Sequence, residues 1–269
     1  MTRHAIKQQL RTAYRLMTMF GIDPRKALNS VRGLPSYFHA LRTLQHQQDS
    51  AKSRFSFGRP YPCLGDRFTE CGTATGHYFH QDLLVARRIH QNSPQIHLDV
   101  GSRVDGFVAH VASFRKIHVI DIRPATNAIP NIDFIQADLM ENIRADLIDY
   151  CDSLSCLHAL EHFGLGRYGD PVHYDGYLLG LDNLNRILKQ HGKFYFSVPI
   201  GPQRIEFNAH RIFSVAYLLE LFTGKYRIDH FSFVDDIGDL YEDVDLTDER
   251  IISNFGCDYG CGIFEMTKL

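Results

Sequence analysis

The sequence predicts an α/β protein: a doubly wound, mostly parallel sheet of seven strands with a helical extension at its N-terminus. From about residue 76, short apolar runs alternate with helical patterns, which indicates right-handed crossovers between parallel strands and helices on both faces of the sheet. The last two apolar runs are not separated by a clear helical pattern. Apolar residues at helical spacing over residues 1–48 predict the extension.

The composition is that of a globular protein. The chain has 269 residues, of which 44% are hydrophobic and 22% charged, and this excludes a disordered, collagen-like or disulfide-rich chain. The apolar run over residues 16–22 is interrupted by Thr18 and Gly21. It is too short to span a membrane and does not resemble a signal peptide. We therefore expect a cytoplasmic protein without a transmembrane segment.

The N-terminal extension is expected to contain two helical stretches and a linker. Gly21 and Pro24 end the first stretch. Ser, Arg, Gly and Pro dominate residues 49–67, which indicates a connecting segment. The apolar face of the second stretch consists of Leu28, Val31, Tyr37, Leu41 and Leu44.

Charge is divided unevenly along the chain. Residues 1–60 carry 11 Lys and Arg against 2 Asp and Glu, whereas residues 61–269 carry 18 against 29. We expect two domains with these bounds, a basic helical extension with its linker and an acidic α/β domain. The extension either docks on the acidic domain, which we favour because its basic residues are not clustered, or makes a weak contact with a membrane or a partner. The acidic domain would repel phosphates, so no nucleic-acid partner is expected.

Seven strands are expected, at residues 96–100, 117–121, 132–136, 153–157, 193–198, 226–234 and 262–268. Helical patterns lie between the first five strands, most clearly over residues 177–189, and another over residues 215–221 precedes the sixth strand. Residues 235–249 are acidic and loop-like. The last two strands are therefore expected to pair as an antiparallel edge.

Neither disulfide bonds nor a metal site are expected. The six cysteines include no pair at the two-residue spacing of zinc ribbons, and Cys257 and Cys261 form an isolated C-x3-C. Reduced cysteines that fill small apolar sites are the expected state. His158, His162 and His173 could bind zinc or iron, but no carboxylate–histidine spacing specifies such a site.

Polar residues follow the first three predicted strands. Ligands of open parallel sheets bind at the carboxyl ends of the strands. The first strand leads into Asp99, Gly101 and Ser102, and a glycine there lets backbone N–H groups approach a ligand. Asp121 ends the second strand and could accept both hydroxyls of a ribose, while Asp138 follows the third strand and could accept from the exocyclic amine of adenine. This edge of the sheet is expected to bind a nucleotide-like cofactor.

Residues 158–175, after the fourth predicted strand, are rich in side chains suited to chemistry. The segment has three histidines together with carboxylates and tyrosines, and we expect it to line the acceptor side of the pocket. Removal of a proton from a hydroxyl near neutral pH suits histidine, so His158 and His162 are candidate general bases, with His210 the next candidate. The candidate substrate-binding residues are Glu161, Asp170, His173 and Arg211.

These elements resemble the class I S-adenosylmethionine-dependent methyltransferases, whose core has seven strands with the last one antiparallel. The resemblance covers roughly residues 76–269. It is carried by Leu98-Asp99-Val100-Gly101 for the glycine loop, Asp121 for the ribose acid, Ala137-Asp138-Leu139 for the adenine segment, His158-Ala159-Leu160-Glu161-His162 for the LEH motif, and residues 192–199 for the fifth strand. More narrowly, residues 76–83 and 100–107 resemble a nematode-named family of unknown function with this core.

The glycine loop departs from the family pattern D/E-x-G-x-G-x-G, because Arg103 and Asp105 stand at the second and third glycines. Arg103 either pairs with the methionine carboxylate of the cofactor or fills the pocket and prevents binding. The resemblance implies S-adenosyl-L-methionine as cofactor. The candidate cofactor-binding residues are Asp99, Gly101, Ser102, Arg103, Asp121, Asp138, Leu139, Tyr78 and Cys156.

The resemblance implies an S-adenosylmethionine-dependent methyltransferase, and we expect it to act on a hydroxyl of a small molecule or a glycan. The alternative is a non-catalytic, methyltransferase-like binding or regulatory module whose altered loop no longer holds the cofactor. An NAD-dependent oxidoreductase is disfavoured, because G-x-G-x-x-G is absent after the first predicted strand.

Overall fold

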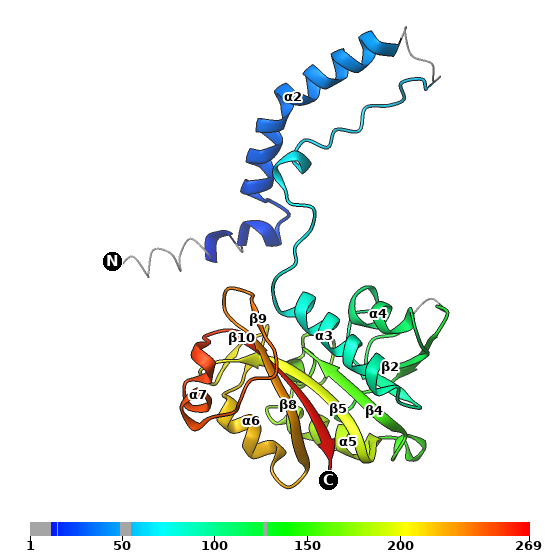
Figure 1. Ribbon diagram of the computed structural model, residues 1–269, viewed down its shortest axis with the longest axis vertical. Helices are drawn as coiled ribbons and strands as arrows, with labels where there is room; N and C mark the ends of the chain where they lie inside the picture. Colours follow the sequence, from blue (N-terminus) through cyan, green and yellow to red (C-terminus); the bar gives the residue numbers. More distant parts are fainter. Residues whose placement is uncertain (1–11, 15, 49–54, 126–127) are drawn as a thin grey trace. The chain divides into compact units, whose positions relative to one another are not determined.

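The computed structural model describes residues 12–14, 16–48, 55–125 and 128–269 (Figure 1). The chain divides into two compact units, Met1–Thr73 and Ala74–Leu269. Residues 1–11 and 15 of the expected helical stretches, and residues 49–54 of the expected linker, lie outside the described residues. No helix within the described ranges is long and apolar enough to cross a membrane.

The first unit is built around helix α2, Pro24–Gln48. This confirms the second helical stretch. Its expected apolar face is largely open, because the side chains of Leu28, Val31 and Leu44 are each more than half exposed. Gly33 is the buried residue of the helix. A Cβ atom at this position would lie 2.0 Å from the carbonyl oxygen of Leu64, so the chain after the helix packs closely against it.

The second unit contains one eight-stranded sheet with the order β3-β2-β1-β4-β5-β10-β8-β9 (Figure 1). The strands are β1 His97–Val100, β2 Ile117–Asp121, β3 Ile132–Gln136, β4 Cys151–Leu157, β5 Leu188–Ile200, β8 Tyr226–Val234, β9 Leu240–Tyr241 and β10 Gly260–Lys268. Strands β1 to β5 pair in parallel, and β10 is antiparallel to both β5 and β8. The predicted doubly wound, mostly parallel sheet is thus confirmed.

The last two predicted strands, β8 and β10, pair antiparallel as expected, and β10 lies between β5 and β8. One expectation about this end of the sheet was wrong. The acidic segment 235–249 is not all loop, because it contains the short strand β9, which pairs with the end of β8. The ring of Tyr241 on β9 stacks on that of Phe233 with centroids 4.7 Å apart. A two-residue strand is too short to produce a period-two apolar pattern, which is why the sequence gives no sign of it.

The helices of this unit are α3 His77–Asn92, α4 Ala109–Ala112, α5 Gly176–Ile187, α6 Val215–Phe222 and α7 Asp248–Ile252. Helices α5 and α6 confirm the two clearest helical predictions. The expected helices between β2 and β3 and between β3 and β4 are wrong: the described residues there include only a 3-10 turn, Ala145–Leu147. The few residues that link β2 to β3 leave no room for a helix and its two turns. A hairpin, β6 Arg204–Glu206 and β7 His210–Ile212, follows β5.

Helices cover both faces of the sheet. On one face, apolar side chains of α3 and α4 pack on the strands, including Leu84, Ile89 and Val111. On the other face, α5 and α6 contribute buried side chains such as Leu184 and Phe222. Full burial of each of these side chains stabilises the fold by about 1.5–3 kcal/mol.

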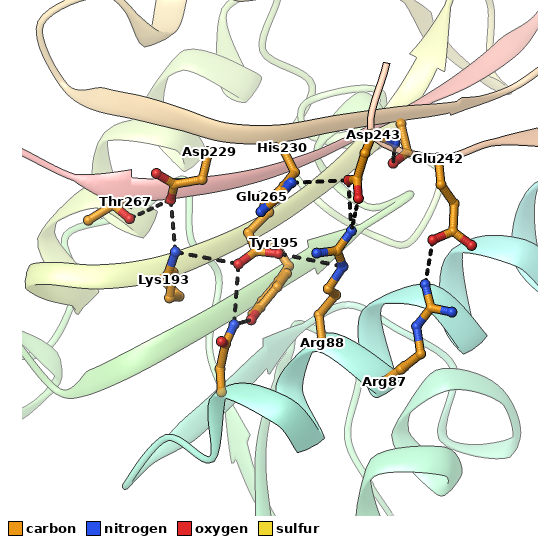
Figure 2. A network of polar contacts seen from close by, with 12 residues as sticks. Arg87, Arg88, Lys193, Tyr195, Asp229, His230, Glu242, Asp243, Glu265 and Thr267 are labelled. Carbon is orange, nitrogen blue, oxygen red and sulfur yellow. Dashed lines mark hydrogen bonds and ion pairs between the residues drawn. The ribbon is translucent and has the colours of Figure 1, made fainter. Parts of the chain in front are cut away.

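A polar network fixes α3 to the antiparallel half of the sheet (Figure 2). Arg88 of α3 donates to both carboxylate oxygens of Asp243 at 2.7 Å. Asn92, at the end of the same helix, donates to the hydroxyl of Tyr195 on β5 and to Glu265 on β10. These contacts hold the helix in place, and its first residues, His77 and Tyr78, lie beside the carboxyl end of β4.

Candidate active site

Two adjoining cavities open at the carboxyl ends of β1, β2 and β4, where the chain turns to opposite sides of the sheet. We call them together the switch-point cleft. The larger has a volume of about 900 Å³, within the range of small-molecule sites. Both cavities are lined by Gly101, Asp121, Arg123, His158 and Tyr168. The smaller cavity also has Asp138, Leu139, His162 and Asp170 in its wall, and the larger has Tyr78, Ser102 and Arg103.

Asp99 does not line the cleft but holds the glycine loop through hydrogen bonds. Its carboxylate is fully buried and accepts hydrogen bonds from the backbone N–H and hydroxyl of Ser102 and from the hydroxyl of Ser155. Burial disfavours the charged form and raises the pKa of Asp99 to about 7, although these hydrogen bonds oppose the rise. Gly101 has a φ of 74°, and a Cβ there would lie 2.9 Å from that of Ala159. The loop therefore needs glycine at this position.

Asp121 faces the cleft but is already paired. The side chain of Arg123 donates to both of its carboxylate oxygens, at 2.9 and 2.6 Å, and the backbone N–H of Arg123 donates to it at 2.8 Å. The guanidinium of Arg123 also lies 4.7 Å from the ring centre of Tyr168. A ribose that bound Asp121 would therefore have to displace the Arg123 side chain.

The smaller cavity is a mainly apolar slot. Its apolar walls include Ile120, Ala137, Leu139 and Phe163, with the carboxylates of Asp121 and Asp138 also in the lining. Asp138 accepts from the backbone N–H of Met140 at 2.8 Å, which fixes its side chain. Cys156 does not reach the cleft. It lies fully buried within β4, and burial raises the pKa of its thiol well above the usual value.

Arg103 does not plug the cleft. Its side chain is 75% exposed and donates two hydrogen bonds to the equally exposed Asp105. The residue stands at the rim, where a ligand carboxylate would have to compete with Asp105 for it.

His158 and Glu161 form a buried pair at the end of β4. His158 has a φ of 49°, a strained conformation for a residue with a side chain. Its Nδ1 lies 2.7 Å from Oε1 of Glu161, and its Nε2 is buried without a hydrogen-bond partner. Burial lowers the pKa of His158, but the neighbouring Cys261 and Glu161 outweigh this and raise it to about 10. The pair makes His158 a poor proton acceptor at neutral pH.

His162 is better placed to accept a proton. Its Nδ1 lies 2.7 Å from the carbonyl oxygen of Ala209, so Nδ1 carries the hydrogen and Nε2 is left as the acceptor. Nε2 lies 3.8 Å from Oε1 of Glu161, whose charge would stabilise the imidazolium. Burial lowers the pKa of His162, against the effect of Glu161, and the ring is neutral at pH 7.

The remaining candidates lie away from the cleft or serve the loop. His210 is half-buried beneath the ring of Tyr259, with ring centres 5.1 Å apart. His173 is exposed. Arg211 is buried and donates to the carbonyl oxygens of Glu161, Phe163 and Tyr174, which is a structural role. Asp170 reaches the cleft wall while accepting from the backbone N–H groups of Gly164, Gly166 and Tyr168.

Arg123 and Cys261 are not among the site residues predicted from the sequence. Nothing in the sequence around Arg123 distinguishes it from an ordinary surface arginine. Cys261 could have been found from topology: because β10 is antiparallel, its first residues lie at the edge where the parallel strands end, and Cys261 pairs with Pro199 near the end of β5.

The fold is that of the class I methyltransferases. It is similar to the 1,6-didemethyltoxoflavin-N1-methyltransferase of Burkholderia thailandensis, a structure with bound 1,6-didemethyltoxoflavin and S-adenosylhomocysteine, with a TM-score of 0.50 and 15% identity over 70% of this chain and 78% of that one. It is also similar to the N-methyltransferase NodS of Bradyrhizobium japonicum, with a TM-score of 0.46 and 11% identity over 72% and 88% of the two chains. Comparison with curated proteins finds no sequence match.

Within this fold class the chain belongs to the family described as Caenorhabditis protein of unknown function, DUF268, whose model matches residues 116–254. The matched segment runs from just before β2 to just after α7. It includes Asp121, Asp138, His158 and His162, but not the glycine loop.

Proposed function

We propose that the protein is an S-adenosylmethionine-dependent methyltransferase acting on a hydroxyl of a small molecule or glycan. The observation that carries the proposal is the switch-point cleft, which places an apolar slot, two strand-end carboxylates and a neutral histidine around one space. The similar Burkholderia enzyme, which shares the fold, was crystallised with S-adenosylhomocysteine.

The residues of the cleft fit this cofactor. The slot lined by Ile120 and Leu139 offers apolar walls for an adenine ring, with Asp138 beside it for the exocyclic amine. Asp121 would accept the ribose hydroxyls once Arg123 is displaced. Gly101 and Ser102 would lie along the methionine end, where Arg103 offers a cation for its carboxylate.

When bound, the cofactor supplies an activated methyl group on a sulfonium, so the protein has to align the acceptor and remove its proton. His162 removes the proton. Its Nε2 accepts the hydroxyl hydrogen as the oxygen–methyl bond forms, and Glu161 stabilises the resulting imidazolium. Ala209 holds the tautomer that this step needs. Tyr168 and Arg167 cover the cleft beside His162 and limit access of water.

Calorimetric titration of the full chain with S-adenosylhomocysteine tests the cofactor assignment. Asp121→Asn removes the charged acceptor of two hydroxyl hydrogen bonds, each worth about 1.5–3 kcal/mol, so we expect affinity to fall at least tenfold. Asp146→Asn is the matched control, because Asp146 forms the same kind of pair with Arg144 outside the cleft. Equal affinity of the two variants for S-adenosylhomocysteine would show that Asp121 does not bind the ribose.

One observation favours the alternative, a non-catalytic module. The Asp121 carboxylate, which the ribose hydroxyls would need as acceptor, is already occupied by the side chain of Arg123. A chain that has lost cofactor binding would give no heat of binding in the same titration, in the parent protein and in Arg123→Ala alike.

A further inference from the structure

Three side chains with metal-ligating atoms meet beside the switch-point cleft, and one of them, His158, also lines it. They are His77, the first residue of α3; His158, which directly follows β4; and Cys261, near the start of β10. One ligand atom from each residue lies within 4.8 Å of the other two. The three histidines weighed from the sequence do not assemble in this way, because His173 is exposed elsewhere.

The scaffold, rather than a loop, brings the three residues together. Strand β4 ends at this edge of the sheet, and β10 starts there because it runs antiparallel to β5. Helix α3 begins there as well, and the network around Arg88 and Asn92 anchors its other end. The positions of the three residues are therefore set by β4, β10 and α3.

His158 has the arrangement of a metal-binding imidazole, and an ion that binds its Nε2 replaces the proton that the imidazolium carries there. Its Nδ1 is held by Oε1 of Glu161 at 2.7 Å, and both side chains are at least 97% buried. Its other nitrogen, Nε2, is buried and has no hydrogen-bond partner. Metal-binding histidines commonly donate their second N–H to a carboxylate, which fixes the ring and strengthens the ligand. A buried nitrogen without a partner is costly, and an ion would satisfy it.

The other two side chains are also positioned and available. The ring of His77 is parallel to that of His158, with centroids 5.1 Å apart, and forms a hydrogen bond with the backbone of Tyr259. Cys261 is fully buried, and its Sγ lies 3.9 Å from Oε1 of Gln81 and from the carbonyl oxygen of Gly262 and also interacts with His158.

We propose that His77, His158 and Cys261 bind one zinc ion beside the switch-point cleft. Two imidazoles and a thiolate suit Zn²⁺, and three protein ligands leave a fourth position for water or a substrate atom. Zinc bonds of about 2.0–2.3 Å place tetrahedral ligand atoms roughly 3.3–3.8 Å apart, so the trio has to contract by about 1 Å. Because His158 also lines the cleft, the ion lies where it can contact a bound acceptor. This proposal is independent of methyl transfer.

The test is substitution with Co²⁺, whose bond to a thiolate gives a sulfur-to-metal charge-transfer absorption. The full chain with Cys63→Ser and Cys71→Ser is used, because these two cysteines are exposed and would bind cobalt on their own. We expect one Co²⁺ per chain with that absorption, displaced by Zn²⁺. Cys261→Ser should lose the absorption, whereas Cys257→Ser, which changes another buried cysteine outside the trio, should keep it.

A second variant keeps the proposal testable if Cys261→Ser fails to fold. His77→Gln changes a half-buried residue at a helix start, and we expect zinc affinity to fall at least tenfold with unchanged circular dichroism. The proposal is overturned if the folded parent binds no stoichiometric cobalt, if Cys261→Ser retains the absorption, or if His77→Gln binds zinc as tightly as the parent. Asp121→Asn should bind zinc normally, which separates this outcome from failure of the cofactor assignment.

Discussion

At the scale of single residues, burial decides what the polar side chains at the strand ends can do. Asp99, one residue before the end of β1, and Asp121, the last residue of β2, look equivalent in the sequence. Asp99 is fully buried and organises the glycine loop through Ser102, whereas Asp121 faces the cleft and binds Arg123. Among the histidines, Glu161 holds Nδ1 of His158 and helps to raise its pKa to about 10, whereas burial lowers the pKa of His162 and leaves its Nε2 as a proton acceptor.

The buried Asp99 gives stability a specific pH dependence. Its pKa is raised from 3.8 to about 7 in the folded state, so ionisation is more costly there than in the unfolded chain. The free energy of unfolding should therefore decrease as pH rises from about 4 to 7, because the folded protein has to ionise a buried carboxyl. Asp99→Asn stays neutral, and its serine partners can reorient their hydroxyls. We expect the variant to lose less stability than the parent between pH 5 and pH 8 in urea denaturation.

Asp133→Asn is the control for this measurement, because Asp133 is an exposed aspartate paired with Lys116 and its pKa is lowered. It should follow the parent's pH profile over the same interval. A parallel profile for Asp99→Asn and the parent would mean that the Asp99 carboxyl carries no penalty.

The role of His162 predicts a separation of binding from turnover. His162→Asn removes the proton acceptor, and loss of a general base typically costs about 10²–10⁴-fold in rate. Calorimetric affinity for S-adenosylhomocysteine should change little. Because burial lowers the pKa of His162, turnover by the parent should persist at pH 6.5 and fall only in more acidic buffer. Transfer of a radioactive methyl group to a panel of hydroxylated acceptors measures turnover. Full turnover by the variant would place the base elsewhere.

At the scale of elements, helix α3 is the part on which the site depends most. It carries His77 and Tyr78 at one end and is fixed at the other by the network of Figure 2. Arg88 is 18% exposed and binds both oxygens of Asp243, whereas the neighbouring Arg87 is 50% exposed and binds Glu242. Each arginine therefore forms an ion pair with the same part of the chain, and the two ion pairs differ mainly in how far the arginine is buried.

Arg88→Ala should destabilise the protein by about 1–2 kcal/mol, because it removes a partly buried charged pair and its packing. Arg87→Ala should cost less than about 1 kcal/mol, as expected for exposed ion pairs. Urea denaturation of both variants measures the difference. Equal losses in the free energy of unfolding would show that the more buried ion pair of Arg88 stabilises the protein no more than the exposed pair of Arg87.

Elements could be predicted from the sequence where an apolar pattern is long enough. Strands β2, β3 and β8 begin and end at the predicted residues, because each combines apolar residues with clear flanking turns. Strand β9 has only two residues and leaves no periodic signal. The missing helices on either side of β3 have different causes: the connection from β2 to β3 is short, and the residues after β3 pack as a loop at the cleft, as Leu139 does.

At the scale of the whole molecule, topology assembles a site from residues far apart in sequence. Strand-end positions such as Gly101, Asp121 and Asp138 could be predicted, because every parallel strand delivers its carboxyl end to one edge. The direction in which each side chain points could not be predicted from the sequence. Burial turned Asp99 and Cys156 away from the cleft, and the antiparallel β10 brought Cys261 to the same edge from the end of the chain.

A crystal structure of the full chain grown with saturating S-adenosylhomocysteine tests the central claim most directly. We expect the adenine between Ile120 and Leu139, the ribose hydroxyls on Asp121, and the Arg123 side chain released from that carboxylate. The claim would be contradicted by crystals in which the cleft holds no ligand and Arg123 remains on Asp121, or in which the ligand is bound at another place.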